Sequence, residues 1–587
     1  MKWKRTIFNG LSGFLIALSL LVLLNLFSAR LDARLDCTNE KRFTLSPSTI
    51  DLLESLDEPV DITIYLSGDI RTEFRKLANS TDDVLTNFKS YAANRIRFRF
   101  ENPGAGLSDS AKFALYDSLT MMGIRPTTQK AQTKAGESEG QRQVFPGAIV
   151  SYKGMQLGID LLQGQVQKSI FRSEELLDRQ TLNSAEALLE FKFASSIQKL
   201  VSLTSDNQPS VGYLIGHGEI PFFSLDIYDL SKTLLTQYNL DTINLKTTEQ
   251  ISPETYNCLV MMRPVMPLTD TDKLKLDQYL LKGGRVLVLA DMLYAERDSL
   301  QTGMMMAYAR NLDLNDLLFR WGVRINPDLI ADQQCEEIPV EVGNIGGKSQ
   351  YQLLGWPFFP LFQPGSSHPL VKNQSFVSGS FANSMDTVQA ETGVQKTILL
   401  SSSNLSAKKA TPAIIDINSI QQIADFNTYT QKNIPVAVLS EGRFRSLFAN
   451  NLSTAQDSLM KKSGSAFVAE SVKPGKVITI ADADIAVNQV SDKIGPLPMG
   501  TNKLTKISYA NHDFIANCIE YLANDKHLLD ARAKDYSLQL IDPKRADAQK
   551  TTWQLINLVA PILFMIFLAF FLEAFRRKKY ATISKSV

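Results

Sequence analysis

The 587-residue chain has few of the side chains that carry most enzyme chemistry. It contains four cysteines and four histidines. The cysteines are Cys37, Cys258, Cys335 and Cys518. No two of them form a C-x-x-C pair, which excludes a zinc ribbon or a disulfide scaffold. The histidines form neither an H-E-x-x-H motif nor an H-x-H pair, so we expect no catalytic zinc and no other metal site.

The chain also lacks an excess of charge of either sign, with 62 basic and 61 acidic side chains. This balance argues against nucleic acid as a partner. Nucleophile motifs are missing as well, because neither G-x-S-x-G nor G-x-C-x-G occurs. Cys258 lies within the apolar stretch NCLVMM, which predicts an inert, buried thiol. We therefore expect no enzymatic activity and no cofactor.

One stretch imitates a phosphate-binding loop. GNIGGKSQ ends in Gly347-Lys348-Ser349, but the motif needs a glycine five positions before Gly347, where Val342 stands. It also needs a helix afterwards, whereas the prolines and aromatic residues of 349–364 follow. The LSGGQ signature of an ABC ATPase does not occur. We expect this chain to hydrolyse no ATP.

Two long runs contain no charged residue, one at 6–29 and one at 551–572. About 20 apolar residues span the hydrocarbon core as a helix, so both runs predict transmembrane helices. We assign residues 1–30 to a cytoplasmic N-terminus with the first helix, and 551–573 to the second. The first run is longer than the apolar part of a signal peptide, and no A-x-A site follows it directly, which favours an uncleaved anchor.

Basic residues flank the outer ends of both runs, with Lys2, Lys4 and Arg5 before the first and four at 576–579 after the second. Cytoplasmic flanks carry such an excess of positive charge. The pattern predicts a two-pass protein of the bacterial inner membrane with both termini in the cytoplasm, including a basic tail at 574–587. The bulk of the chain would then be periplasmic.

The first part of that bulk, 31–203, reads as a small α/β domain. Ile62 and Ile64 alternate with polar residues in 60–68, as in a strand, and apolar residues recur at helical spacing in 71–93. A second strand follows at 94–104. This strand–helix–strand unit suits a thioredoxin-like fold. The polar stretch 127–143 predicts an exposed hairpin or loop, and 184–202 predicts a helix.

The second part, 204–530, predicts a larger α/β domain, joined to the second span by a stalk at 531–550. Apolar strands at 211–216, 257–264 and 285–291 alternate with helices at 225–239 and 268–284, which favours a mostly parallel sheet covered on both faces. Further strands are expected at 396–403, 435–442 and 476–484. Thr269 or Asp270 can cap the helix at 268–284, and Gly283 can end it.

Polar residues follow several of these strands. Gly216-His217-Gly218-Glu219 comes after the first, Asp291 after the third, and Asp482 near the end of the last. Ligands bind at the carboxyl ends of parallel strands, so His217, Glu219, Asp291 and Asp482 are the candidate ligand or partner contacts. The alternatives for His217 are catalysis, such a contact, or a structural turn, and the glycines on both sides favour the turn.

Several stretches together resemble the gliding-motility family GldG, an auxiliary component of ABC transporters. They include LDCTNEKRFTLSPSTIDLLESLDEPVDITIYLSGD after the first span, YLIGHGEIP, WPFFPLFQPGSSHPLVKN and VAVLSEGRFRSLFANNL. A stretch of more than 60 residues, beginning IADADIAVNQVSDKIGPLPMG, is also similar. The family more usually has Leu-Thr where LDCTNE stands.

The resemblance implies a membrane protein that works beside a separate ATPase subunit and a multi-span permease subunit, often described as a substrate-binding component. It also implies a larger domain similar to the class I glutamine-amidotransferase fold without the catalytic cysteine of that fold, and it assigns no catalytic residue.

Three hypotheses follow. The leading one is a non-enzymatic transporter subunit whose outer region binds a partner or substrate. The second is a solute receptor with a small-molecule pocket, and the third an anchored hydrolase that uses His217, Asp291 or Asp482. In the second span, Asn557 and Pro561 are expected to face another transmembrane helix, with the permease as the natural partner.

Overall fold

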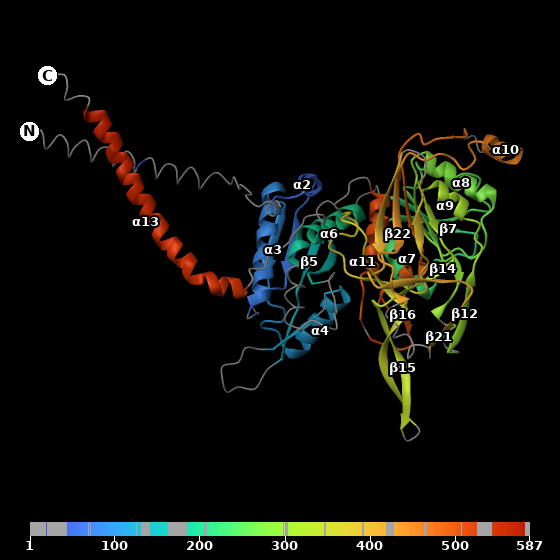
Figure 1. Ribbon diagram of the computed structural model, residues 1–587, viewed down its shortest axis with the longest axis horizontal. Coiled ribbons are helices and arrows are strands. Elements are labelled where there is room, and N and C mark those ends of the chain that lie inside the picture. The colour runs from blue at the N-terminus through green and yellow to red at the C-terminus, as the bar shows by residue number, and fades with distance from the viewer. Residues whose placement is uncertain are drawn as a thin grey trace, which may run out of the picture. The chain divides into compact units, whose positions relative to one another are not determined.

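The computed structural model describes Ser19 and most of the chain from residue 44 to residue 581 (Figure 1). The described ranges are 44–68, 70, 72–124, 126–130, 141–162, 185–204, 208–297, 299, 303–345, 348–389, 393–417, 428–462, 466–505, 507–524 and 543–581. The chain forms two compact units, 1–535 and 536–587. The predicted first membrane span, 6–29, and Cys37 lie outside the described residues, Ser19 excepted.

The first α/β region is built on a four-stranded sheet of order β2-β1-β5-β6. Its strands are β1 (Val60–Ile64), β2 (Ile96–Phe100), β5 (Gly147–Tyr152) and β6 (Met155–Asp160). β1 and β2 are parallel, while β5 is antiparallel to both β1 and β6. The helices among its described residues are α2 (Pro47–Glu54), α3 (Thr72–Tyr91), α4 (Asp109–Met121) and α6 (Leu189–Leu203). The predicted strand–helix–strand unit is confirmed as β1-α3-β2.

The spacing of apolar residues explains these elements. Val60, Ile62 and Ile64 of β1 are buried, and the residues between them are not. In α3 the buried Leu77, Leu85 and Phe88 recur at helical spacing, so one face of that helix covers the sheet. α6, the last helix of this region in the sequence, packs against the same core. The predicted hairpin in 127–143 is confirmed by the antiparallel pair β3 (Thr127–Lys130) and β4 (Gln141–Val144).

The larger region contains a ten-stranded sheet whose main path is β15-β16-β19-β22-β23-β10-β9-β7-β8. Its parallel part consists of β7 (Ser210–Ile215), β8 (Asn239–Asn244), β9 (Cys258–Met262), β10 (Arg285–Leu289) and β23 (Gly475–Ile480). Its antiparallel part adds β15 (Cys335–Ile345), β16 (Lys348–Pro364), β19 (Val394–Ser401) and β22 (Pro435–Gly442), and β17 (Val377–Ser378) pairs with β16.

The prediction of a mostly parallel sheet is therefore wrong for the part formed by β15, β16, β19 and β22. The strands predicted at 396–403, 435–442 and 476–484 nevertheless exist. β22 and β23 are antiparallel neighbours, yet both are nearly continuous runs of buried residues. A strand reads as a continuous apolar run whenever both of its faces are covered, whatever its direction. Burial, and not direction, produced the pattern in the sequence.

Helices cover both faces of the sheet. α7 (Tyr228–Gln237) and α11 (Asn511–Ala523) pack on one face with Tyr213 and Val260, whereas α8 (Asp270–Leu281) and α9 (Asn315–Arg320) pack on the other with Met261 and Val288. α10 (Thr454–Lys462) adds Met460 against Leu274 of α8. Thr269 caps α8 in a reciprocal pair with Asp272, and Gly283 ends that helix at φ +97°. Both predictions for this helix are confirmed.

Small sheets and turns complete the region. They are β11 (Leu293–Tyr294), β12 (Met304–Ala309) and β21 (Ala413–Asp416); β13 (Val323–Ile325) with β18 (Met385–Thr387); β14 (Asp328–Asp332) with β20 (Ser406–Ala410); β24 (Val490–Ser491) with β25 (Gly495–Pro496); and the 3-10 turns η1 (Leu225–Ile227) and η5 (Ala483–Ala486).

β15 and β16 form a long antiparallel arm, drawn in yellow at the lower side of Figure 1. Lys348 and Ser349 of the phosphate-loop imitation begin β16, so a strand and not a helix follows the glycines. The structure thus has a strand where the phosphate-binding motif requires a helix.

The described residues of the second unit form the long helix α13 (Pro543–Ala581), with Pro561 inside it. Its segment Gln549–Phe575 is long and apolar enough to cross a membrane, and is the one helix of that kind among the described residues. The predicted span at 551–573 lies within it. The helix already begins at 543, so the last part of the predicted stalk is helical.

Candidate functional site

Four parallel strands end at the same edge of the large sheet and present polar residues there. His217 follows β7, Arg263 follows β9, Asp291 follows β10, and Asp482 follows β23. The structure divides these residues between two clusters. His217 and Glu219 belong to one, and Asp291 and Asp482 to the other.

The first cluster surrounds His217, whose side chain has no exposed surface. Its Nε2 lies 3.2 Å from Oδ2 of Asp272, and its Nδ1 lies 3.7 Å from Oε1 of Glu219, beyond hydrogen-bond distance. The other carboxylate oxygen of Glu219 accepts the backbone N–H of His217 at 2.6 Å. The ring is thus enclosed between two buried carboxylates.

The backbone of this turn is held as firmly as the ring. Gly216 and Gly218 have φ values of +123° and +76°, which favour glycine. The carbonyl oxygen of His217 accepts the N–H groups of Val265 and Met266, each at 2.9 Å. The turn after β7 is therefore tied directly to the segment that follows β9.

Asp272 connects the same cluster to α8. Its Oδ2 accepts a hydrogen bond from the Thr269 hydroxyl at 2.6 Å, and its Oδ1 lies 3.4 Å from Nζ of Lys275. Burial alone would raise the pKa of Asp272, but the hydrogen bonds from His217 and Thr269 lower it to about 2. The hydrogen bond to Asp272 and the interactions with Glu219 raise the pKa of His217 to about 9, against the effect of burial. An imidazolium at neutral pH thus joins the β7 turn to the start of α8.

The second cluster centres on Arg263, a residue with φ +54°. Its Nε lies 3.1 Å from Oδ2 of Asp291, and one terminal nitrogen lies 3.5 Å from Oδ1 of Asp484. The other oxygen of Asp291 accepts the backbone N–H of Ala483 at 2.7 Å. Asp484 contributes most to raising the pKa of Arg263, whereas burial raises that of Asp291. Arg263 links the ends of β9, β10 and β23.

Asp482 is fully buried, and its carboxylate is used by the backbone. One oxygen accepts the N–H of Ser380 at 2.8 Å, and the other accepts the N–H of Asp484 at 3.0 Å. Burial and the neighbouring carboxylates of Asp484 and Asp291 raise the pKa of Asp482 well above its usual value. A Cβ added at Gly379 would lie 2.4 Å from this carboxylate, so the chain is closely packed around it.

The residues that complete both clusters are missing from the sequence interpretation. In the sequence, Asp272 stands out only as part of the helix predicted at 268–284, and Arg263 only as part of the strand predicted at 257–264. Arg263 could have been found, because it follows the predicted strand 257–264 at the same edge as Asp291. Glu336 carried no signal, yet it is buried and accepts hydrogen bonds from Ser378 and, at 2.8 Å, from Asn502.

The partners of these side chains decide what chemistry they can perform at the carboxyl ends of the strands. Within the described ranges, no group of three or more His, Cys, Asp or Glu residues is arranged to hold a metal ion. Cys258 is fully buried, as predicted, and burial raises the pKa of its thiol to about 12. His217, Asp291 and Asp482 each hold chain segments together through the contacts described above.

Two family models match the sequence, and solved structures match it at low identity and low TM-score. Residues 39–151 match a domain of unknown function, DUF7088. No curated protein matches the sequence. Among solved structures, the mmIFT52 N-terminal domain is 13% identical with a TM-score of 0.30, over 54% of this chain and 100% of that one. The exo-beta-1,4-mannosidase Op5Man5 from Opitutaceae bacterium strain TAV5 is 8% identical with a TM-score of 0.18, over 50% of this chain and 35% of that one.

The decisive match covers the larger α/β region. Residues 208–518, more than half of the chain, match the model of a family described as an ABC-type uncharacterized transport system, of the auxiliary kind. This range contains both clusters at the strand ends and most of the large sheet. The protein therefore belongs to the auxiliary family of ABC-type transport systems.

Proposed function

We propose that the protein is a non-enzymatic, membrane-anchored subunit of an ABC transporter that couples a partner or substrate outside the membrane to a permease and a separate ATPase. The proposal rests on which side chains occupy the carboxyl ends of the parallel strands. The place where α/β enzymes bind substrates is occupied here by a buried histidine between two carboxylates and by an arginine paired with Asp291 and Asp484. These groups hold the scaffold together.

A non-enzymatic subunit acts by contact, and one surface of the larger region suits contact. In the three-stranded sheet β11-β12-β21, Met306 is opposite Ile414 and Tyr294 is opposite Tyr308. These four side chains and Met304 are 40–58% exposed on one face. The residues between them, such as Met305 and Ile415, are buried on the other face. Exposed apolar patches mark interaction sites, and methionine adapts to varied partners. We call these five residues the apolar face.

The remaining parts of the proposal concern topology and fold. Both termini are cytoplasmic, residues 6–29 form a first span, and the bulk of the chain is periplasmic; the basic flanks of the two apolar runs support this arrangement. The order β2-β1-β5-β6, with β1 and β2 parallel, supports a thioredoxin-like fold for the first region. The five parallel strands between helices support an amidotransferase-like larger domain, and the GldG resemblance supports a link to gliding motility.

The proposal is tested by purifying the tagged full-length protein from membranes of its native cells in mild detergent and identifying the chains that accompany it. We expect an ABC ATPase and a multi-span permease in fixed ratio. ATP hydrolysis should require the ATPase chain and be absent from the subunit alone. A subunit that purifies without both chains from cells that express them would overturn the proposal.

A further inference from the structure

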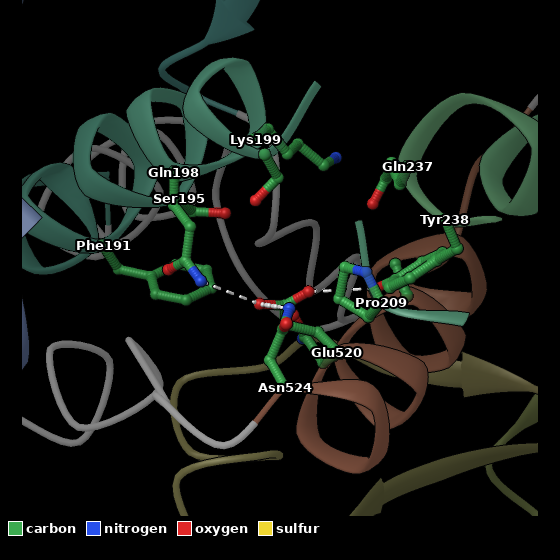
Figure 2. Close-up of a pocket in the computed structure, with 12 residues that line it drawn as sticks. Phe191, Ser195, Gln198, Lys199, Pro209, Gln237, Tyr238, Glu520 and Asn524 are labelled. Atoms are coloured by element: carbon green, nitrogen blue, oxygen red, sulfur yellow. Dashed lines mark hydrogen bonds between the residues drawn. The ribbon is translucent and has the colours of Figure 1, made fainter. Parts of the chain in front are cut away.

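A cavity of about 60 Å³ lies where α6, the start of β7, the end of α7 and α11 meet (Figure 2). None of its lining residues belongs to the two clusters at the strand ends. Its polar lining includes Ser195, Lys199, Gln237, Tyr238, Asn517 and Glu520. So many polar groups from several elements converge here that the site needs an account of its own.

Glu520 is the acceptor around which one wall is built. Its Oε2 accepts the Tyr238 hydroxyl at 2.9 Å. Its Oε1 accepts the side-chain amides of Asn524 at 2.6 Å and Gln198 at 3.4 Å. Figure 2 shows these bonds converging on Glu520 from three elements. Both carboxylate oxygens are therefore occupied by neutral donors, and Glu520 forms no direct ion pair with a lysine among the described residues.

Two donors of the lining have no protein acceptor among the described residues. Within the described part of the chain, Lys199 makes no hydrogen bond or ion pair, and Glu520 and Asp513 act on its charge only from longer range. Lys199 is half-buried, and partial burial lowers the pKa of its ammonium group. The Nδ2 group of Asn517 is buried without a partner, and that residue is only 9% exposed. In Figure 2 the end of Lys199 points into the space between α6 and Gln237.

The buried amide of Asn517 costs free energy while it has no acceptor, and the half-buried ammonium of Lys199 faces the same cavity, so this arrangement favours an occupant that supplies both an acceptor and a negative charge. We propose that the cavity binds a small monocarboxylate, with one end of the carboxylate paired to Lys199 and hydrogen-bonded to the amide of Asn517.

The charged side chains that line the cavity favour an anion of single charge. Lys199 is the lysine of the lining, and the carboxylate of Glu520 stands in the same cavity. A dianion such as phosphate would bring a second negative charge close to Glu520 with no second cation to balance it. A neutral amide of the same size would leave the ammonium unpaired. A single carboxylate matches one ammonium and one amide donor, and the small volume restricts its size.

Saturation-transfer NMR on the detergent-solubilised full chain, with acetate as the probe, tests the assignment. We expect saturation of the acetate methyl signal in the wild type. In Lys199→Met, acetate binding should weaken about tenfold or more, because a charge-assisted contact is lost. Acetamide should give little saturation, and inorganic phosphate should not displace acetate.

Two further variants separate binding from folding. Lys232→Met removes an exposed lysine of the neighbouring α7 and should leave acetate binding unchanged. Asn517→Asp keeps the size of the side chain and turns the donor into a negative charge, so it should abolish binding while circular dichroism stays that of the wild type. Equal saturation by acetamide and acetate, or acetate binding that survives Lys199→Met in a folded variant, would overturn the proposal without bearing on the transporter role.

Discussion

The turn after β7 holds a protonated histidine where an α/β enzyme would place a reactive one. His217 joins Glu219 in its own turn to Asp272 at the start of α8, and none of the three side chains has more than slight exposure. Breaking a buried charge pair by removing one partner leaves an uncompensated charge, which costs more than the pair itself contributes. We therefore expect the loss of any one of these three side chains to lower the free energy of unfolding.

His217→Ala should lower the free energy of unfolding by about 3 kcal/mol at pH 7, because it leaves two carboxylates buried without their shared cation. The measurement is chemical unfolding of the detergent-solubilised full chain, followed by tryptophan fluorescence. The control is His512→Ala, whose ring is partly exposed and pairs with Asp229 at 2.9 Å. A smaller loss for His217→Ala than for this control would contradict the role given to the cluster.

The same histidine predicts a pH dependence. Its folded-state pKa of about 9 exceeds its ordinary value of 6.5, so its contribution to stability is complete below pH 6.5 and is lost as the pH rises through about 9. Asp272, with a pKa lowered to about 2 from 3.8, contributes fully above pH 3.8 and loses its contribution as the pH falls through 2. Unfolding midpoints measured from pH 6 to pH 9.5 should fall in the wild type and fall less in Asp272→Asn. Parallel curves would show that this pair does not titrate as described.

Gly218 predicts a steric requirement of the turn. An added Cβ would lie 2.3 Å from Cγ2 of Val265, at a φ of +76°. Gly218→Ala should cost about 2–4 kcal/mol, since strain of the left-handed backbone adds to the clash. Gly154 has a similar φ of +82° with nothing within 4 Å of its Cβ position, so Gly154→Ala should cost about 1–2 kcal/mol from strain alone. The measurement is the chemical unfolding midpoint of each variant. If both variants lower it equally, the contact with Val265 can relax.

Single residues were predictable from sequence where the cause is local. Thr269 and Gly283 mark the ends of α8 through hydrogen bonds and backbone angles that depend on near neighbours, and Cys258 is buried because its own strand is apolar. The partnership of His217 with Asp272 spans 55 residues and depends on how α8 lies against β7. No spacing in the sequence contains that information.

At the scale of elements, the strands β7, β9, β10 and β23 were predictable, whereas β8 was not predicted as a strand. In the antiparallel half, β19 and β22 were predicted as strands but their direction was not, and β15 and β16 were not predicted. β15 and β16 carry prolines and aromatic residues that resemble a loop, yet they pair along most of their length, with irregular register near Cys335 and Glu341. Pairing of this kind is decided by long-range partners, so local pattern misses it.

The apolar face on β11-β12-β21 supplies an element-scale prediction. Met306→Asp places a charge at the middle strand of that face, where the side chain is 58% exposed, so folding should tolerate it. If the face contacts a partner, co-purification of the permease or of another partner chain should fall severalfold, because a buried, unpaired carboxylate disfavours the complex. Ile494→Asp, at a residue that is 70% exposed and outside this face, is the matched control. Unchanged yields for both variants would remove the apolar face from the interface.

For the whole molecule, the relevant surface is α13. Its segment Gln549–Phe575 is entirely exposed in the isolated chain and carries large apolar side chains on all sides, as expected of a helix in lipid. Reporter fusions at either terminus should behave as cytoplasmic, and a reporter inserted at 131–140 should behave as periplasmic. Cytoplasmic activity of the inserted reporter would reverse the proposed orientation.

Asn557 and Pro561 interrupt this apolar surface at one place. Proline has no N–H to donate to the carbonyl four residues earlier, which is that of Asn557. The side-chain amide and the backbone carbonyl of the same residue therefore both need partners, about 12 Å along the helix from Gln549 at 1.5 Å per residue. Lipid offers none, and helices in membranes associate through such polar groups.

Asn557→Leu should therefore reduce co-purification of the permease while membrane insertion of the full chain stays unchanged. Leu558→Val, one position away and apolar before and after, is the matched control and should retain the complex. Pro561→Ala tests the backbone half of the argument, because it restores the N–H donor for the Asn557 carbonyl and should weaken the association less than Asn557→Leu. Cysteine cross-linking from position 557 should trap the permease, and a position that reacts only with lipid-soluble reagents, together with an undiminished complex in Asn557→Leu, would place this face of α13 against lipid instead.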